Sequence, residues 1–102
     1  MKAFEREFGE KFGLKNVASV NSGTVALELA YELAGIGAGD EVIVPVLTHP
    51  ATGLPAVHRG ASIVFADIDR DLNVSVEDVR RKITPKTKAI IFVHFGGNNR
   101  GL

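Results

Sequence analysis

The apolar positions of this 102-residue chain follow two patterns that alternate along its length. In the first pattern, apolar residues recur every three or four positions, which places them on one face of an α-helix. In the second, they form short, nearly unbroken runs rich in Val and Ile, which is typical of strands buried in a parallel sheet. The sequence therefore predicts one small α/β domain in which helices and strands alternate.

Four helices and four strands are predicted. The helices are the segment that carries Phe4, Phe8 and Phe12 and ends at Gly13, residues 24–34, a helix capped by Thr48 that runs to about residue 58, and one that opens at Ser75 and closes at Thr84-Pro85. The strands are residues 17–20, 41–46, 62–68 and 88–95. Units of this kind join parallel strands by right-handed crossovers, so we expect a parallel sheet of about four strands alternating with helices.

Polar residues stand where the predicted strands end. These residues are Ser22, Thr48, Asp67 and His94. Because ligands of parallel α/β sheets bind at the carboxyl ends of the strands, we expect a binding site at this edge. Three phenylalanine rings on one helical face, by contrast, are more typical of a core or an interface than of cofactor contacts.

The turn Ser22-Gly23-Thr24 joins the first predicted strand to an Ala- and Leu-rich helix. The first N–H groups of a helix have no partner inside it, and the helix dipole places partial positive charge there, so a phosphate can bind without a basic side chain. Gly23 lets a ligand approach the backbone, and Ser22 and Thr24 add hydroxyl donors. The simpler alternative is that these residues only turn the chain and cap the helix.

Charge and composition narrow the choice of partner and compartment. The 12 basic and 12 acidic residues give a formal net charge of zero and are scattered, which does not indicate binding to nucleic acid or to an anionic membrane. The sequence has no cysteine for a disulfide or a thiolate metal site, and its amino terminus does not resemble a signal peptide. We expect a cytoplasmic chain whose partner is a small molecule or another protein.

The order of several motifs resembles one known family. These motifs are Asn21-Ser22-Gly23-Thr24-Val25-Ala26-Leu27, Gly37-Ala38-Gly39-Asp40-Glu41-Val42-Ile43-Val44-Pro45, Thr48-His49-Pro50-Ala51-Thr52, Val64-Phe65-Ala66-Asp67 and Ile83-Thr84-Pro85-Lys86-Thr87-Lys88-Ala89. Together they resemble the pyridoxal-phosphate-dependent sugar aminotransferases of the DegT/DnrJ/EryC1/StrS type, which have the aspartate aminotransferase fold (fold type I). The resemblance implies that residues 1–102 are a single partial domain, the N-terminal portion of the large domain of such an enzyme.

The resemblance also implies roles for four residues. Gly23 and Thr24, with Ser22 beside them, would hold the phosphate of pyridoxal phosphate. His49 would face the pyridine ring of this cofactor. The alternative for His49 is a histidine at a helix start that faces solvent.

Other implied roles are structural or fall outside this chain. Asp67 is expected to tie loops together, and His94 to lie near the pocket or within the core. The family's Schiff-base lysine, and the aspartate that pairs with its pyridine nitrogen, match no residue of this sequence. We therefore expect no catalytic residue in this chain and no turnover by this chain alone. For the same reason, the sequence does not distinguish an aminotransferase from a dehydratase of the same family.

Three hypotheses on function follow. The leading one is the N-terminal portion of a nucleotide-sugar aminotransferase, which moves an amino group from an amino acid donor to a keto-sugar and forms a homodimer or otherwise self-associates. The second is a stand-alone α/β module that binds a phosphorylated small molecule. The third is a non-catalytic domain that self-associates through exposed strand edges and the phenylalanine face.

The resemblance also has an implication for the sheet. In the topology of this family, residues 17–20 are separated from the other three predicted strands by strands that come from later sequence.

Overall fold

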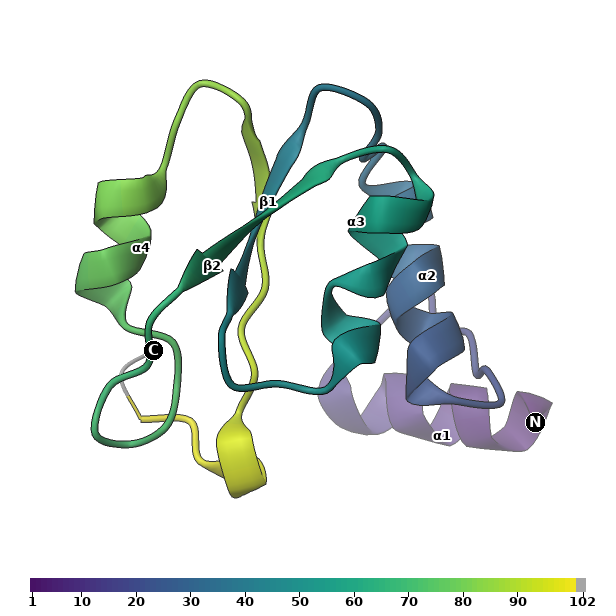
Figure 1. The fold of residues 1–102 in the computed structure, drawn as a ribbon. Helices are drawn as coiled ribbons and strands as arrows, with labels where there is room; N and C mark the ends of the chain where they lie inside the picture. The colour runs from purple at the N-terminus through teal and green to yellow at the C-terminus, as the bar shows by residue number, and fades with distance from the viewer. Residues whose placement is uncertain (101–102) are drawn as a thin grey trace.

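A three-stranded parallel sheet forms the centre of the structure, a computed structural model that describes residues 1–100 (Figure 1). β1 (Glu41–Pro45) lies in the middle and pairs with β2 (Ser62–Ala66) on one side and β3 (Thr87–Ile90) on the other. Pairing with β2 is regular along all of β1, whereas pairing with β3 shifts register after Glu41. The predicted α/β fold with a parallel sheet is confirmed.

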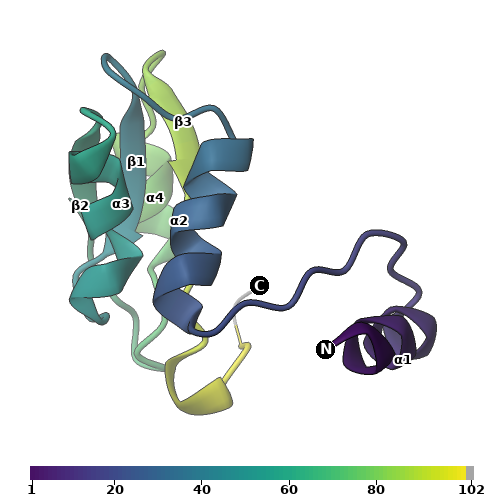
Figure 2. The ribbon, with the colours of Figure 1, turned by 90° about the vertical axis from the view of Figure 1, so that its right-hand side faces the viewer.

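Helices cover both faces of this sheet (Figures 1 and 2). α2 (Gly23–Leu33) and the short α3 (Leu54–His58) lie on one face, and α4 (Val76–Lys82) lies on the other. Two short 3-10 helices follow β1 and β3, namely η1 (Pro50–Thr52) and η2 (Phe95–Gly97). Within residues 1–100, no helix has both the length and the apolar character needed to span a bilayer.

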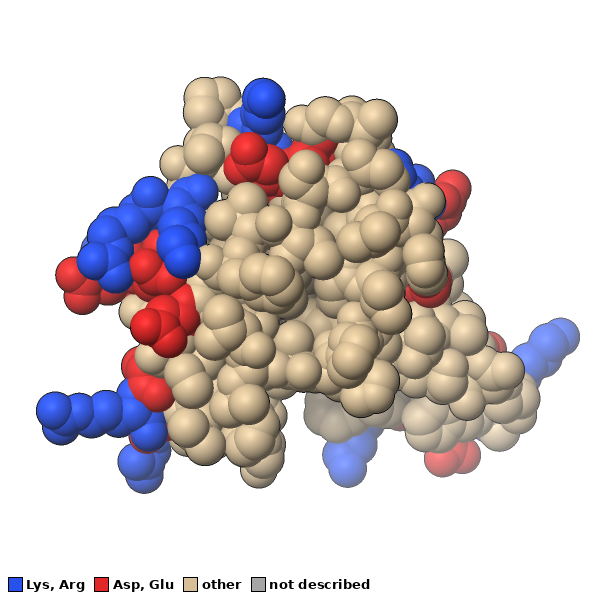
Figure 3. Space-filling view, in the orientation of Figure 1, with Lys and Arg blue, Asp and Glu red and all other residues tan. Residues whose placement is uncertain are grey.

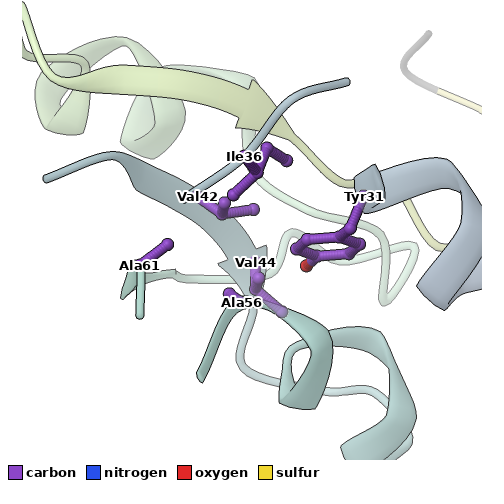
Figure 4. Packing of buried hydrophobic residues seen from close by; sticks show 6 residues of the cluster. All are labelled: Tyr31, Ile36, Val42, Val44, Ala56 and Ala61. Atoms are coloured by element: carbon purple, nitrogen blue, oxygen red, sulfur yellow. The ribbon is translucent and has the colours of Figure 1, made fainter. Parts of the chain in front are cut away.

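The core consists of two clusters because successive side chains of a strand point to opposite faces. On the α2 side, Val42 and Val44 of β1 belong to a cluster of six buried residues (Figure 4), which are Tyr31, Ile36, Val42, Val44, Ala56 and Ala61. On the α4 side, the buried residues are Ile43, Ala66, Val74 and Val79. β1 is therefore buried on both faces, which explains its unbroken apolar sequence.

α1 (Lys2–Phe12) lies apart from the sheet, at the end of an extended segment (Figure 2). The carboxylate of Glu5 accepts hydrogen bonds from the Ser19 N–H at 2.7 Å and from the Ser19 hydroxyl at 2.8 Å. These bonds hold the pKa of Glu5 below its usual value, the one from the backbone contributing most. They tie α1 to the segment that follows it rather than to the sheet.

The predicted phenylalanine face of α1 is present but uncovered. The rings of Phe4, Phe8 and Phe12 stack in sequence, with centroids 5.6 and 4.6 Å apart. Phe4 is 58% exposed and Phe12 is 57% exposed. Within this chain the face is therefore not part of a core, and its use as an interface stays a prediction.

Residues 17–20 do not form the predicted first strand, so the sheet has three strands instead of about four. A parallel strand exists only through hydrogen bonds to a neighbouring strand. The segment between α1 and α2 runs away from the sheet in Figure 2, and β1 already has a neighbour on each side. The strand predicted at residues 17–20 is therefore wrong, because no strand within residues 1–100 pairs with this segment.

Two other strands end earlier than predicted. β2 ends at Ala66, because the chain then turns into an isolated antiparallel bridge between Ile68 and Val74. After β3, the Ile91 N–H still donates to the Ile43 carbonyl at 2.9 Å. The following residues have only β1 as a possible neighbour, and β1 ends at a proline, which has no N–H to donate.

Charged side chains of both signs gather over α4, whereas few lie over the middle of the same face (Figure 3). α4 begins with Glu77 and Asp78 and ends with the basic residues Arg80, Arg81 and Lys82. This order places negative charge at the positive end of the helix dipole and positive charge at its negative end. The mixed signs give this part of the surface no strong field of one sign.

Asp78 links the start of α4 to the end of β2. Its Oδ2 accepts a hydrogen bond from the Asp67 N–H at 2.7 Å and lies 3.0 Å from the Lys82 Nζ, while its Oδ1 accepts from Arg81 at 2.9 Å. The backbone hydrogen bond from Asp67, followed by the interaction with Lys82, lowers the pKa of Asp78 from 3.8 to about 2. The fold therefore favours the charged form of this carboxylate, which is only 6% exposed.

This shift predicts an acid-sensitive contribution to stability. Because the folded-state pKa of Asp78 lies below the unfolded value, the carboxylate stabilises the fold above about pH 4, and this contribution is lost as pH falls toward about 2. We expect Asp78→Asn to lower the free energy of unfolding at neutral pH and to converge with the wild type in acid. Urea unfolding at a series of pH values measures both effects. Glu77→Gln, exposed in the same turn, is the control, and parallel pH profiles for Asp78→Asn and wild type would contradict the prediction.

Candidate functional site

Three segments meet at the edge of the sheet formed by the carboxyl ends of the strands. The start of α2, the loop after β1 and the segment after β3 all lie at the lower edge of the molecule in Figure 1, and Figure 2 places them at the same end. Ser22, Thr48 and His94 belong to these three segments. This is the edge at which parallel α/β sheets bind ligands.

The start of α2 has free hydrogen-bond donors. Ser22 is the N-cap, and its Oγ accepts a hydrogen bond from the Val25 N–H at 3.2 Å, while its carbonyl accepts from the Ala26 N–H at 3.1 Å. In the described residues 1–100, no hydrogen bond uses the N–H groups of Gly23 and Thr24. These exposed donors at the positive end of an 11-residue helix can bind an anion. The hydroxyl hydrogen of Ser22 can add a third donor.

Gly23 leaves the space above these donors open. A Cβ added at this position would meet no atom of the chain within 4 Å, and the φ angle of Gly23 is not in the left-handed region. Neither the backbone conformation nor the packing of the described residues therefore requires glycine here. A missing side chain at this point gives a ligand close access to the amides of α2.

His49, and not Thr48, caps the first turn after β1. The imidazole Nδ1 of His49 accepts a hydrogen bond from the Ala51 N–H at 3.1 Å. Thr48, the predicted cap, instead pairs its hydroxyl with the Thr52 hydroxyl at 2.6 Å. His49 takes the role because Nδ1 lies as close to its own backbone as the oxygen of Asn or Asp, so it can reach the N–H two residues on.

The single helix predicted from Thr48 to about residue 58 is divided into η1 and α3, which meet at Gly53. Pro55 has no N–H and fits only in the first turn of a helix, so a helix cannot run through it. A Cβ at Gly53 would lie 2.9 Å from the Cδ1 of Ile63, so a side chain there would require the end of the Ile63 side chain to move.

Tyr31 joins the two halves of the site. Its hydroxyl donates a hydrogen bond to the Thr52 carbonyl at 2.7 Å, although the two residues are 21 positions apart in the chain. The tyrosine is 1% exposed, and its ring lies beside Val44 and Ala56 in Figure 4. Burial, and secondarily the charge of Glu28, raises the pKa of Tyr31, so the hydroxyl stays a donor. The sequence analysis missed this residue because the apolar face of a helix predicts burial but no hydrogen-bond partner.

The remaining predicted residues contact only structural neighbours. The Oδ1 of Asp67 accepts from the Ile68 N–H at 2.8 Å, a bond within its own turn. His94 is exposed at the start of η2, so the alternative of a core histidine is wrong. His58 Nδ1 lies 3.0 Å from the Glu28 Oε1 and links α3 to α2.

Asn73 holds the segment after β3, another role that the sequence analysis missed. It is 5% exposed, its Nδ2 donates to the carbonyls of Asn98 at 2.9 Å and Arg100 at 3.0 Å, and its Oδ1 accepts from the Phe95 N–H at 3.1 Å. A polar residue between two apolar ones, Leu72 and Val74, was the signal available in the sequence. Its partners lie too far along the chain to be predicted locally.

Among the hollows on the described surface, one reaches the site. A hollow of about 210 Å³ is lined mainly by apolar side chains of β1, β2 and α3 and includes Thr48 and His49. A larger one, of about 520 Å³, lies between α1 and the segment after it and contains none of the predicted site residues. Among the residues described, no group of three His, Asp or Glu side chains is placed to hold a metal ion.

Comparison with known sequences connects this geometry to a family. Residues 1–101 match the profile of the DegT/DnrJ/EryC1/StrS aminotransferase family. A GDP-perosamine synthase of Vibrio cholerae is 52% identical over 95 residues, which are 92% of this chain and 26% of that protein. The spore coat polysaccharide biosynthesis protein SpsC of Bacillus subtilis is 46% identical over 100 residues, 97% of this chain and 26% of that protein. The chain thus spans about a quarter of the length of these relatives.

Solved structures agree with the sequence comparison. The crystal structure of 3-amino-5-hydroxybenzoic acid synthase superposes with a TM-score of 0.88 at 41% identity, covering 94% of this chain and 25% of that one. A putative sugar aminotransferase of Streptococcus pneumoniae, Spr1654 in its PLP-form, gives a TM-score of 0.81 at 37% identity, covering 87% of this chain and 23% of that one. The similarity therefore extends from sequence to the arrangement of the elements.

The hydrogen bond from the Tyr31 hydroxyl to the Thr52 carbonyl can be tested by removing the hydroxyl oxygen. We expect Tyr31→Phe to lower the free energy of unfolding by about 1–2 kcal/mol, because it keeps the ring but leaves a buried carbonyl without its donor. Urea unfolding measures the loss. Hydrogen exchange of the amides of residues 51–53 should be accelerated in Tyr31→Phe more than that of the amides of β1. An unchanged free energy of unfolding would show that the bond does not support the loop.

Proposed function

Because this chain belongs to the DegT/DnrJ/EryC1/StrS aminotransferase family, we propose that it supplies the phosphate-binding side of a pyridoxal-phosphate-dependent nucleotide-sugar aminotransferase. The complete enzyme would move an amino group from an amino acid donor to a keto-sugar in the cytoplasm. Residues 1–102 would form the N-terminal portion of its large domain, since the chain spans about a quarter of the relatives it matches.

The start of α2 is the observation that carries this proposal. The N–H groups of Gly23 and Thr24 are exposed and take part in no hydrogen bond among residues 1–100, and the space above Gly23 is open. A phosphate carries two negative charges and several acceptor oxygens, so it matches paired N–H donors at a helix N-terminus. Ser22, Gly23 and Thr24 therefore fit the phosphate of the cofactor.

The pyridoxal ring supplies the reaction chemistry when it is bound, because it can act as an electron sink. The residues of this chain bind and orient it. Ser22, Gly23 and Thr24 would anchor one end through the phosphate. His49 belongs to the loop after β1, which lies at the same edge of the sheet, and its imidazole offers a flat face. The chain would be inactive alone, since the lysine that bonds to the cofactor in this family matches none of its residues.

Self-association is part of this proposal. The phenylalanine face of α1 is exposed, and so are Phe65 on β2, at 54%, and Phe92 after β3, at 43%. Exposed apolar surface of this kind is typical of protein interfaces. A homodimer or another assembly would cover it.

Gly23→Ala separates folding from phosphate binding. The added methyl group meets no atom of the chain, and alanine favours helix more than glycine does, so we expect the melting temperature to stay unchanged or rise. The same methyl group would block the approach of a phosphate to the amides. We expect the affinity for pyridoxal phosphate, measured by absorbance titration in the protein that carries this chain, to fall about tenfold or more, the loss of roughly one charge-assisted hydrogen bond.

Two controls make this result specific. Pyridoxal, which lacks the phosphate, should bind equally to the wild type and to Gly23→Ala. Ser75→Ala removes a matched cap, a 3.2 Å bond to the Asp78 N–H at the start of α4, and should leave the affinity for pyridoxal phosphate unchanged. Equal affinity of wild type and Gly23→Ala for pyridoxal phosphate would refute the proposed function, and a preference for nucleotides would favour a stand-alone phosphate-binding module.

A further inference from the structure

We propose that His49 is a positioning residue, whose hydrogen bond to η1 fixes its imidazole in one tautomer and orients it before the cofactor binds. The hydrogen bond itself does not depend on any ligand. The role that we assign to this hydrogen bond, which is to hold the flat ring of His49 against the cofactor, rests on the proposed function.

The hydrogen bond determines where the proton of the ring lies. Nδ1 of His49 accepts from the Ala51 N–H at 3.1 Å, and an accepting nitrogen needs its lone pair. A neutral imidazole with a lone pair on Nδ1 carries its hydrogen on Nε2. A ring protonated on both nitrogens has no acceptor and cannot form the cap. Between the two tautomers of the ring, the loop therefore selects the one with its hydrogen on Nε2.

The backbone that carries His49 is fixed by its neighbour Thr52. The Thr52 N–H donates to the His49 carbonyl at 3.0 Å, its hydroxyl pairs with Thr48 at 2.6 Å, and its carbonyl accepts from Tyr31 at 2.7 Å. Thr52 is only 6% exposed, whereas His49 is exposed. The imidazole thus projects from a rigid turn, and the bond to Ala51 restrains the side-chain torsions that remain.

The imidazole of His49 lies beside an apolar hollow. It contributes to the wall of the 210 Å³ hollow, together with apolar residues such as Leu54, Ile63 and Phe65. The faces of a neutral imidazole are apolar enough to stack on an aromatic ring. Its Nε2–H remains as a single donor for an oxygen of the cofactor or substrate.

His58 provides a matched contrast within the same chain. Its Nδ1 lies 3.0 Å from the Glu28 Oε1, and an ionised carboxylate only accepts hydrogen bonds, so Nδ1 of His58 must carry the hydrogen. The two histidines are therefore expected to differ at Nδ1. One should be an acceptor and the other a donor.

Nitrogen NMR of the ¹⁵N-labelled chain in alkaline buffer, without cofactor, tests the tautomer. We expect His49 to show an unprotonated Nδ1 and a protonated Nε2, and His58 to show a protonated Nδ1. The signals of His49 are assigned by their loss in His49→Asn. A protonated Nδ1 in His49, or one averaged signal for its two nitrogens, would overturn the proposal.

Two variants separate the cap from the ring. His49→Asn keeps an acceptor for the Ala51 N–H but has no ring, and His49→Phe keeps a flat ring but has no acceptor. We expect His49→Phe to speed hydrogen exchange of the Ala51 amide by about fivefold, the usual effect of losing a cap, and His49→Asn to change it by less than about twofold. Equal exchange rates of the Ala51 amide in the two variants would show that His49 does not act as a cap.

The role of His49 toward the cofactor is tested by a measurement that loss of the helix cap alone would not change. In the protein that carries this chain, we expect His49→Asn to weaken the affinity for pyridoxal phosphate and for pyridoxal alike by about three- to tenfold, because stacking is lost. Unchanged affinity in His49→Asn would overturn the positioning role. Gly23→Ala acts on the phosphate alone, so failure of this inference and failure of the proposed function are distinguishable.

Discussion

The hydrogen bond from the Tyr31 hydroxyl to the Thr52 carbonyl is the constraint on which the candidate site depends. The phosphate-binding amides belong to α2 and the imidazole of His49 belongs to the loop after β1, and neither element is part of the sheet. Strand pairing therefore does not fix their relative position. Tyr31 joins them directly, because it is anchored in the core beside Val44 and its hydroxyl reaches the loop, while the contact of His58 with Glu28 links α3 to α2. A phenylalanine could fill the same volume but could not hold the loop.

What could be predicted from the sequence is what depends on short-range contacts. The Ser75 cap was predicted correctly, and a cap at the Ser22-Gly23-Thr24 turn was weighed as the simpler alternative, because a cap and its N–H partner are three residues apart. Apart from the strand at residues 17–20, which does not form, and the third helix, which is divided at Gly53, the order of helices and strands was also correct, since periodicity is local. The bonds of Tyr31 and Asn73 join residues more than 20 positions apart, and no spacing rule foresees them. His49 as a cap was missed because imidazole is an uncommon capping group.

The missing first strand has a different cause. Residues 17–20 have the apolar pattern of a strand, yet within residues 1–100 no strand pairs with them. The phenylalanine face of α1 is likewise exposed within these residues, and its use as an interface stays a prediction. An apolar pattern shows that a segment gains stability by burial, but it does not identify what buries it. β1 had its partners in the same chain, and its prediction was therefore correct.

Gly23 shows how a position can be read when its own chain does not explain it. A Cβ at Gly53 would lie 2.9 Å from the Cδ1 of Ile63, which would have to move, whereas a Cβ at Gly23 would meet no atom within 4 Å. Glycine costs up to about 1 kcal/mol relative to alanine in a helix, so a glycine without a packing or conformational need is a stability loss. Such a loss is typical of positions where a ligand approaches the backbone. The adjacent N–H groups, which make no hydrogen bond within residues 1–100, favour a negatively charged ligand. This supports a phosphate as the group for which position 23 is a glycine.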